Sequence, residues 1–462
     1  MIMKKTSYIF LLFVLPFTVF AQKNQSERLD SLFTALHQNK AFNGNVLIAD
    51  KGNILFEKSF GIANETTGQP LNLQTVFELA SVSKQFTAMG IVLLAKQGKL
   101  NYDDRMAKYI PELGFYGDIT IRQLLHHTAG LPDYMELFEQ HWDKTKFAVN
   151  QDIVDLMATY KPAVLFQPNE KYEYSNTGYA LLGLIIEKAS KKPFSKYLKD
   201  NLFTPLKMKN TLVYRSRYAP QKIDNYALGY VQDSLGKKVT TDSFGKTFYT
   251  YYLDGIVGDG MVNSTLGDLL LWDRALYTDK LVNAADKALI FNAVKTTNGE
   301  ETNYGFGWAI AQKEKYGKIV NHSGSWAGYI TFIERHTDYD KTIILLQNNQ
   351  TMLTVLPVSD VRKILYNEKT ESHNLKTVTL TSDDLDRYLG VYASEGFPLK
   401  LTIFKNDTVL MTQATGQGAI PMTAYENHTF TFDPANITLI FNPDEKTVHL
   451  KQGKMEVLFK KE

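Results

Sequence analysis

The chain has 462 residues, of which 44% are hydrophobic and 22% charged, and its formal net charge is +2. This is ordinary globular composition, which argues against a fibre or a disordered chain, and the length allows two or three domains. The near balance of charge gives no reason to expect nucleic acid or an anionic membrane surface as a partner. The sequence contains no cysteine, which excludes disulfides and thiolate metal sites.

Residues 1–21 have the features of a secretory signal peptide. Lys4 and Lys5 precede an apolar run, Tyr8 to Phe20, and the last residues suit cleavage after Ala21. The run is 13 residues long, too short for a helix that spans a bilayer, and a retained membrane anchor is the alternative. We therefore expect an exported protein, periplasmic or secreted, with no stable membrane span after cleavage.

Apolar spacing predicts helices and strands through most of the chain that follows. Helices are expected at 26–38, from Ser81 to just before Gly98, and at 119–127, 152–160, 177–189 and 268–276. Strands are expected at 45–49, 54–59, 305–311, 330–335 and 342–347. Residues 210–255 lack a clear period, which indicates an elaborated loop region over a site.

The sequence changes character near Val378. Short alternating runs separated by turn residues predict antiparallel strands at 399–404, 408–412, 429–432, 437–441, 448–451 and 456–459. We expect a small all-β domain, a barrel or a sandwich, over residues 378–462, after a catalytic domain over residues 22–370. The role of this β domain stays open, because no catalytic constellation stands in it.

A serine and a lysine three residues apart open the second expected helix. Residues i and i+3 share a helix face, so the Lys84 amine is expected within reach of the Ser81 hydroxyl. A serine hydroxyl is a poor nucleophile until a neighbouring base takes its proton, and a desolvated lysine is such a base. The pair therefore predicts an activated nucleophile, with the free N–H groups of the helix start near a developing oxyanion.

The Ser-x-x-Lys pattern by itself is weak evidence, because it occurs three times. The copies at 234–237 and 243–246 contain a glycine and precede no periodic apolar run, so they are expected in a polar connection. From this pattern alone, Ser81 is either a nucleophile or an ordinary N-cap residue of the helix.

Two other patterns suggest a cofactor or a metal, and neither is expected to bind one. The adjacent His126 and His127 point about 100° apart on a helix, and no further ligand stands at i+4. The segment Gly258-Asp259-Gly260 lacks the third glycine of a dinucleotide-binding loop. We expect no cofactor and no metal.

Three short motifs stand in a set order along the chain: Ser81-Val82-Ser83-Lys84, Tyr174-Ser175-Asn176 and His322-Ser323-Gly324. Together with their flanks they resemble the serine β-lactamase and penicillin-binding-protein superfamily, in its class C-like branch of β-lactamases, DD-peptidases, D-aminopeptidases and esterases. The resemblance covers roughly residues 40–350. It implies an α+β fold, in which an antiparallel sheet flanked by helices lies beside an all-helical lobe and the site lies between them.

The resemblance also implies catalytic roles. Ser81 would be the nucleophile that forms a covalent acyl-enzyme, and Lys84 and Tyr174 would share the general-base work. A phenol has a pKa near 10 in water, so Tyr174 acts as a base at neutral pH only if a cation such as Lys84 favours its anion. A packed aromatic without a catalytic role is the alternative for Tyr174.

The remaining motif residues would bind the substrate. Asn176 would hydrogen-bond the substrate amide and orient the lysine, and His322, Gly324 and Ser325 would lie along the substrate. The oxyanion hole would use the backbone N–H groups of Ser81 and Ser325.

Three positions depart from the family pattern. His322 stands where β-lactamases of this branch usually have lysine, and His-x-Gly resembles DD-peptidases and related peptidases or esterases. Because histidine is a weaker cation than lysine, we expect carboxylate recognition to weaken as the pH rises through the histidine pKa. Asn169 and Lys207 stand where the family often has glycine. Asparagine tolerates positive φ, whereas Lys207 puts the expected turn in doubt.

The resemblance therefore implies an exported serine hydrolase that acts through an acyl-enzyme. Its expected substrates are small molecules or peptides, first of all peptides with D-amino acids, including peptidoglycan fragments. A carboxylesterase is the next alternative, and an efficient β-lactamase the third because of His322. The alternative from another class is a β-lactam-binding or sensor module with little turnover.

Overall fold

The computed structural model describes residues 16–368, 378–397, 399–415, 419–432, 437–452 and 455–462. Two compact units are present, Met1–Thr351 and Met352–Glu462. Most of the expected signal peptide, residues 1–15, and most of the expected linker between 370 and 378 lie outside the described residues. The signal peptide and the domain limits 22–370 and 378–462 therefore stay predictions.

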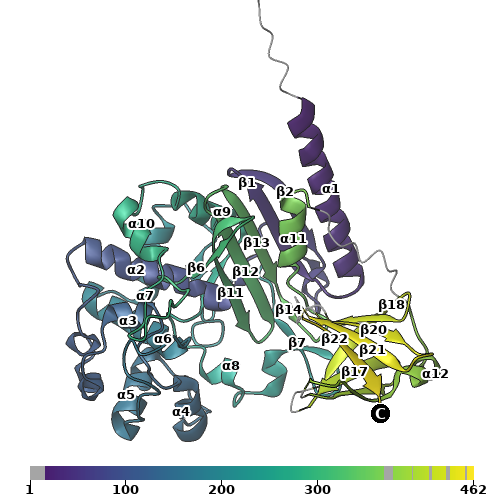
Figure 1. The fold of residues 1–462 in the computed structure, drawn as a ribbon. Helices are drawn as coiled ribbons and strands as arrows, with labels where there is room; N and C mark the ends of the chain where they lie inside the picture. The colour runs from purple at the N-terminus through teal and green to yellow at the C-terminus, as the bar shows by residue number, and fades with distance from the viewer. Residues whose placement is uncertain (1–15, 369–377, 398, 416–418, 433–436, 453–454) are drawn as a thin grey trace, which may run out of the picture. The chain divides into compact units, whose positions relative to one another are not determined.

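A six-stranded antiparallel sheet forms the centre of the first unit (Figure 1). Its strands, in spatial order, are β10 (Ala309–Lys313), β11 (Gly317–Trp326), β12 (Tyr329–His336), β13 (Lys341–Gln347), β1 (Gly44–Asp50) and β2 (Asn53–Phe60). The central strands β1 and β13 are almost wholly buried, which agrees with their continuous apolar runs. β2, at the edge of the sheet, has exposed, intermediate and buried side chains.

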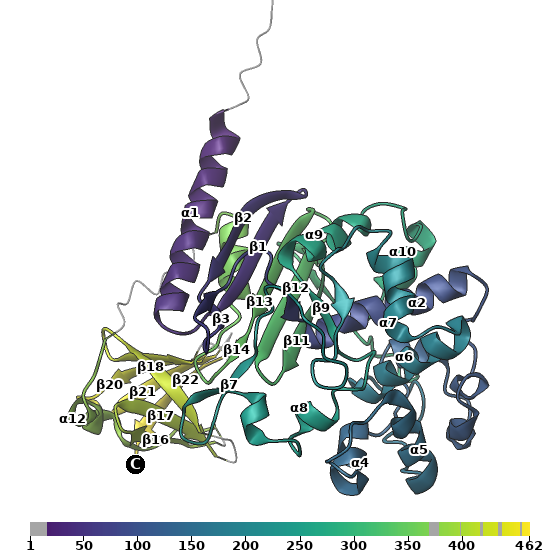
Figure 2. The ribbon, with the colours of Figure 1, turned by 180° about the vertical axis from the view of Figure 1, so that it is seen from behind.

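Helices cover this sheet and build a lobe beside it (Figures 1 and 2). α1 packs along β2, α9 packs on β13 and β1, and α2 packs against α6. The helices of this unit are α1 (Pro16–Gln38), α2 (Lys84–Lys96), α3 (Ile121–Leu125), α4 (Tyr134–His141), α5 (Asn150–Tyr160), α6 (Asn176–Ser190), α7 (Phe194–Leu198), α8 (Tyr249–Tyr252), α9 (Leu266–Ala275) and α10 (Ala284–Ile290). Within the described residues, none of the helices is both long and apolar enough to cross a membrane.

Short elements connect these parts. The short strands are β3 (Ile62–Asn64), β4 (Gln69–Pro70), β5 (Phe77–Glu78), β6 (Leu212–Val213), β7 (Tyr230–Gln232), β8 (Lys238–Thr240), β9 (Val262–Ser264) and β14 (Asn349–Gln350). The short helices are the 3-10 helices η1 (Ala80–Ser83), η2 (Met106–Lys108), η3 (Pro111–Tyr116) and η5 (Thr241–Phe244), and the π-helix η4 (Lys199–Phe203). The region 210–255 is therefore an ordered series of short strands and helices rather than a plain loop. The small sheet β5-β9-β6 fixes the chain just ahead of the Ser-x-x-Lys segment.

Two sequence expectations need correction here. Residues 322–324 lie inside β11, where no strand was expected, and the strand expected at 305–311 is displaced to β10. The turn that Lys207 put in doubt forms: Lys207 adopts φ +61° and its N–H donates to the Thr204 carbonyl at 3.0 Å. Asn169 likewise has φ +66°.

The second unit contains a closed antiparallel barrel whose eight strands follow the chain order. These strands are β15 (Gly390–Ala393), β16 (Leu401–Asn406), β17 (Val409–Ala414), β18 (Ile420–Tyr425), β19 (Thr429–Phe432), β20 (Ile437–Asn442), β21 (Thr447–Gln452) and β22 (Met455–Lys461), preceded by α11 (Val358–Leu365), α12 (Ser382–Leu385) and η6 (Asp386–Tyr388). Tyr388, Phe430 and Phe441 pack edge to face or tilted in its core. The expected small all-β domain and the α+β class are confirmed; β15 and β18 were not expected.

Candidate active site

The Ser-x-x-Lys segment begins as a 3-10 helix. Ser81 lies in η1, and Lys84 is the first residue of α2. Ala80, directly before the serine, has φ +48°, a backbone conformation that costs free energy for any residue other than glycine. The Lys84 Nζ lies 3.3 Å from the Ser81 Oγ. The two groups are within hydrogen-bond reach, as the spacing of the motif predicts.

Lys84 is fully buried and held by three acceptors. Its Nζ donates to Asn176 Oδ1 and to the Asp259 carbonyl, both at 2.9 Å, in addition to Ser81. The ring of Tyr174 lies against the same amine, with 4.9 Å from Nζ to the ring centroid. Ser81 and Tyr174, the two other residues predicted to be catalytic, thus both contact the Lys84 amine.

Tyr174 lies at the open side of this cluster, with 40% of its surface exposed. Its ring packs on His127, with 4.4 Å between centroids, and faces His322 at 6.0 Å. Among the hydrogen bonds of the described residues, none joins its hydroxyl to Ser81 or Lys84. The contact between Tyr174 and Lys84 therefore passes through the ring face.

His322 is buried and has both ring nitrogens occupied. Nδ1–H donates to the Ser323 carbonyl at 2.6 Å, and Nε2 accepts from the Tyr304 hydroxyl at 2.8 Å. Burial and the nearby Lys84 lower its pKa to about 3, against the opposing effect of the Ser323 bond. His322 is therefore neutral near pH 7, which argues against its role as a cation for a substrate carboxylate; the expected pH dependence of carboxylate recognition stays a prediction.

Gly324 lies where β11 passes closest to η1. A Cβ on this residue would lie 2.2 Å from the Leu79 carbonyl oxygen and 2.3 Å from Thr331 Oγ1. Thr331 Oγ1 donates to that same carbonyl at 2.7 Å. Glycine is thus the residue that lets the strand pack directly on the segment that carries Ser81.

A cavity of about 260 Å³ opens beside the serine. Of the predicted site residues, Ser81, Asn176 and Ser325 line it, whereas Lys84, Tyr174, His322 and Gly324 do not. The rest of the lining includes Glu78, Tyr134, Tyr249, Asp259, Trp326 and Gln350. This is room for one small group of a substrate beside the nucleophile.

Comparison with known proteins identifies the family. Residues 29–360 match the family model described as Beta-lactamase. The chain belongs to the β-lactamase family. It is 46% identical over 330 residues to Penicillin-binding protein 4* of Bacillus subtilis strain 168, an alignment that covers 71% of this chain and 73% of that relative.

Solved structures share the fold of this β-lactamase-family protein. The octameric penicillin-binding protein homologue from Pyrococcus abyssi matches with a TM-score of 0.66 and 22% identity, over 94% of this chain and 99% of that one. The D-amino acid amidase from Ochrobactrum anthropi SV3 in complex with D-phenylalanine matches with a TM-score of 0.60 and 24% identity, over 75% of this chain and 99% of that one. The family and the cluster around Ser81 make this protein a serine hydrolase.

Two carboxyls in the cavity were missed by the sequence reasoning. Asp259 Oδ2 accepts the Tyr134 hydroxyl at 2.9 Å, and burial raises the pKa of its carboxyl, against the opposing effect of Lys84. Asp259 lies in the Gly-Asp-Gly segment that was rejected as a dinucleotide loop. Glu78 lies three residues before Ser81. The signal available in the sequence was the position of this glutamate inside an otherwise apolar run.

The two adjacent histidines support the wall of the site. His126 Nδ1 hydrogen-bonds the Tyr304 carbonyl at 2.8 Å, and His127 Nδ1 accepts the Ser175 N–H at 3.0 Å. Burial lowers the pKa of His126 to about 4 and that of His127 well below its ordinary value. Both histidines are thus neutral and act as hydrogen-bonding parts of the fold.

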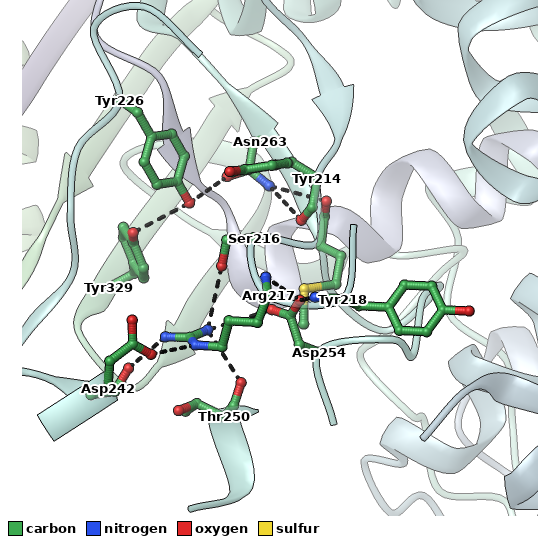
Figure 3. A network of polar contacts seen from close by, with 12 residues as sticks. Tyr214, Ser216, Arg217, Tyr218, Tyr226, Asp242, Thr250, Asp254, Asn263 and Tyr329 are labelled. Carbon is green, nitrogen blue, oxygen red and sulfur yellow. Dashed lines mark hydrogen bonds and ion pairs between the residues drawn. The ribbon is translucent and has the colours of Figure 1, made fainter. Parts of the chain in front are cut away.

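A polar network centred on Arg217 anchors the chain that follows β6 (Figure 3). The Arg217 guanidinium donates to Asp242 Oδ1 at 2.5 Å and to the Thr250 carbonyl at 3.2 Å, and also pairs with Asp254. Asp254 Oδ2 accepts the backbone N–H groups of Arg217 and Tyr218, both at 2.8 Å. This network holds the segment after β6 against α8.

Proposed function

We propose that this protein hydrolyses peptides that contain D-amino acids through an acyl-enzyme at Ser81. The observation that carries the proposal is the 3.3 Å contact between the Ser81 Oγ and the Nζ of the fully buried Lys84. Ser81 Oγ attacks the substrate carbonyl, an ester bond forms, and the bond to the leaving amine breaks. Water then attacks the ester, and Ser81 regains its proton.

Lys84 and Tyr174 share the proton transfers. The Ser81 proton passes to the lone pair that Lys84 Nζ has in its unprotonated form, and Tyr174, whose ring lies against Lys84, passes a proton to the leaving nitrogen. Asn176 Oδ1 and the Asp259 carbonyl hold the lysine in place during these steps. Tyr174 is suited to meet the leaving group because it is the exposed member of the cluster.

Backbone and side-chain groups bind the reacting amide. The N–H groups of Ser81 and Ser325 form the oxyanion hole. Asn176 uses Oδ1 for Lys84, which leaves Nδ2 to donate to a substrate carbonyl. Gly324 keeps β11 close to the nucleophile, and His322 supports that strand as a neutral hydrogen-bonding group.

The preference for D-amino-acid peptides is supported by a relative named as a putative D-alanyl-D-alanine carboxypeptidase, from Escherichia coli strain K12, which is 27% identical over 363 residues. A neutral His322 in place of a lysine makes an efficient β-lactamase the weaker candidate. A carboxylesterase uses the same residues and stays the second candidate. The signal-peptide pattern of residues 1–21 supports export to the periplasm or the medium.

The direct test is release of D-alanine from an acetylated peptide that ends in D-Ala-D-Ala, with the L-Ala-L-Ala peptide as the stereochemical control. We expect turnover of the D-peptide alone, and a loss of about 100-fold or more in kcat for Tyr174→Phe because the group that protonates the leaving nitrogen is removed. Turnover of p-nitrophenyl esters without any peptide cleavage favours the esterase. A permanent adduct without turnover favours the sensor module.

A further inference from the structure

An unpaired carboxyl faces the cavity that contains Ser81. Glu78 lines this cavity, and only 7% of its surface is exposed. In the part of the chain that the structure describes, its carboxyl makes no hydrogen bond and no ion pair. A buried carboxyl without a hydrogen-bonding partner lowers the stability of a folded protein, which indicates that this carboxyl serves in ligand binding.

The polar groups near Glu78 are occupied by other partners. Arg217, the cation that acts on it, is bound to Asp242, Asp254 and Thr250 (Figure 3). The hydroxyl of Tyr226 donates to Asn263 Oδ1 at 3.2 Å. The Glu78 carboxyl is thus left facing the cavity with its own hydrogen-bonding capacity unused.

The remaining neighbours do not supply a partner either. The hydroxyl of Tyr329 donates to the Ala227 carbonyl at 2.7 Å. Burial and the Asp254 charge raise the pKa of Glu78 to about 8, while Arg217 opposes this shift only in part. Glu78 therefore binds a proton in the empty cavity at neutral pH, and a cation brought by a ligand would replace that proton.

We propose that Glu78 binds a protonated amine carried by the part of the substrate that enters this cavity. Among its described lining residues the cavity has two carboxyls, Glu78 and Asp259, and no arginine or lysine, so its charge suits an ammonium group. The substrate class is then amides and peptides with a free amino group near the scissile bond. This inference rests on the proposed function, because it names the substrate of the same serine.

Binding of an ammonium to Glu78 releases a proton. The attraction favours the ionised carboxylate, which lowers the Glu78 pKa when the ligand binds. At pH 7 a carboxyl with a pKa of about 8 is roughly nine-tenths protonated, so about 0.9 proton leaves per complex formed. A residue with a purely structural role gives no such release.

Calorimetric titration of the full chain tests the proposal. In the Ser81→Ala variant, which blocks turnover, D-alaninamide and N-acetyl-D-alaninamide are compared as probes at pH 7 in two buffers of different ionisation enthalpy. We expect D-alaninamide to bind at least ten-fold more tightly, with proton release. Equal affinities of the two probes, or binding without proton release, overturn the proposal.

Variants locate the effect. Adding Glu78→Gln is expected to reduce the ten-fold preference to near unity and to remove the proton release. Glu112→Gln, an exposed glutamate on η3, is the matched control and is expected to keep both. An unchanged preference with Glu78→Gln contradicts the assignment. The comparison of the two probes needs no Glu78 variant, so it decides the question even where Glu78→Gln does not fold.

The proposed function and the proposed role of Glu78 can be tested independently of each other. The titration reports amine binding without any chemistry at Ser81, whereas covalent labelling of Ser81 reports the nucleophile without any amine. An amine preference in a protein that is never labelled contradicts the proposed function alone. Labelling of Ser81 with no amine preference contradicts the role of Glu78 alone.

Discussion

At the scale of single residues, the site depends on a close approach between a strand and the nucleophile segment. Gly324 of β11 leaves room for the Leu79 carbonyl, which a Cβ would meet at 2.2 Å. Both contact atoms are fixed, since one is backbone and the other, Thr331 Oγ1, is hydrogen-bonded to it. A side chain at residue 324 therefore has to push η1, with Ser81, away from β11.

We predict that Gly324→Ala lowers the rate of Ser81 acylation by about 100-fold, because a displacement near 1 Å has an effect of that order. The free energy of unfolding falls by about 1–3 kcal/mol, as is usual for overpacking. Acylation kinetics and urea unfolding measure the two effects. Gly114→Ala is the control, because no atom lies within 4 Å of its added Cβ. An acylation rate equal in the two variants contradicts this account.

The residues that sequence reasoning found and missed differ in one physical respect. Ser81 and Lys84 are three positions apart, so local geometry alone brings them together. Glu78 and Asp259 lie 181 positions apart in the sequence. They reach one cavity only because β5, which contains Glu78, pairs with β9, which Asp259 precedes by three residues. The periodicity of apolar residues in the sequence does not predict such a long-range contact. The protonation state of His322 likewise depends on burial and on Tyr304, which the motif does not contain.

At the scale of elements, clear apolar patterns predicted their structure and interrupted ones did not. The helix expected at 177–189 is α6, and the strand expected at 342–347 is β13. β11 was missed because its polar Asn321 to Ser325 hides the alternation of buried and exposed positions. In the barrel, β18 contains Pro421 and β15 has only four residues, so neither gives a usable signal.

The turn after η4 supplies a prediction at this scale. Lys207 adopts φ +61°, a conformation that costs a residue with a side chain roughly 1–2 kcal/mol. We predict that Lys207→Gly stabilises the protein by up to about 1 kcal/mol, after the added entropy of the unfolded chain is subtracted. Urea unfolding measures this change.

The control for this turn is a neighbouring lysine. Lys209 has no positive φ, so Lys209→Gly is expected to destabilise the protein by about 0.5–1 kcal/mol. A Lys207→Gly variant that unfolds as easily as Lys209→Gly contradicts the strain at residue 207.

At the scale of the whole molecule, buried titratable groups set how stability depends on pH. His126, His127 and His322 have pKa values lowered from 6.5, two of them to about 4 and about 3. Below pH 6.5 the unfolded chain binds protons that the folded protein refuses, so stability falls as the pH falls. Glu78 acts oppositely: its folded pKa of about 8, raised from 4.5, means that stability falls as the pH rises from 4.5 to 8.

We therefore predict a maximum in the free energy of unfolding near pH 7. Each group contributes a slope of at most about 1.4 kcal/mol per pH unit, and near pH 5 the three histidines outweigh Glu78, so the free energy of unfolding falls as the pH falls. Urea unfolding at pH 5, 7 and 8.5 measures the curve. His126→Gln is expected to make the acidic side less steep. A free energy of unfolding that is constant from pH 5 to pH 7 contradicts the buried neutral state of these histidines.

The most direct test of the acyl-enzyme is intact-mass spectrometry after incubation with a penicillin and, separately, with a fluorophosphonate. We predict one adduct per chain in the native sequence and none in Ser81→Ala. Ser83→Ala is the matched control, because its buried hydroxyl only accepts the Val262 N–H at 3.0 Å, and we predict that it is still labelled. An adduct that persists in Ser81→Ala, or a native chain that neither reagent modifies, contradicts a nucleophilic Ser81.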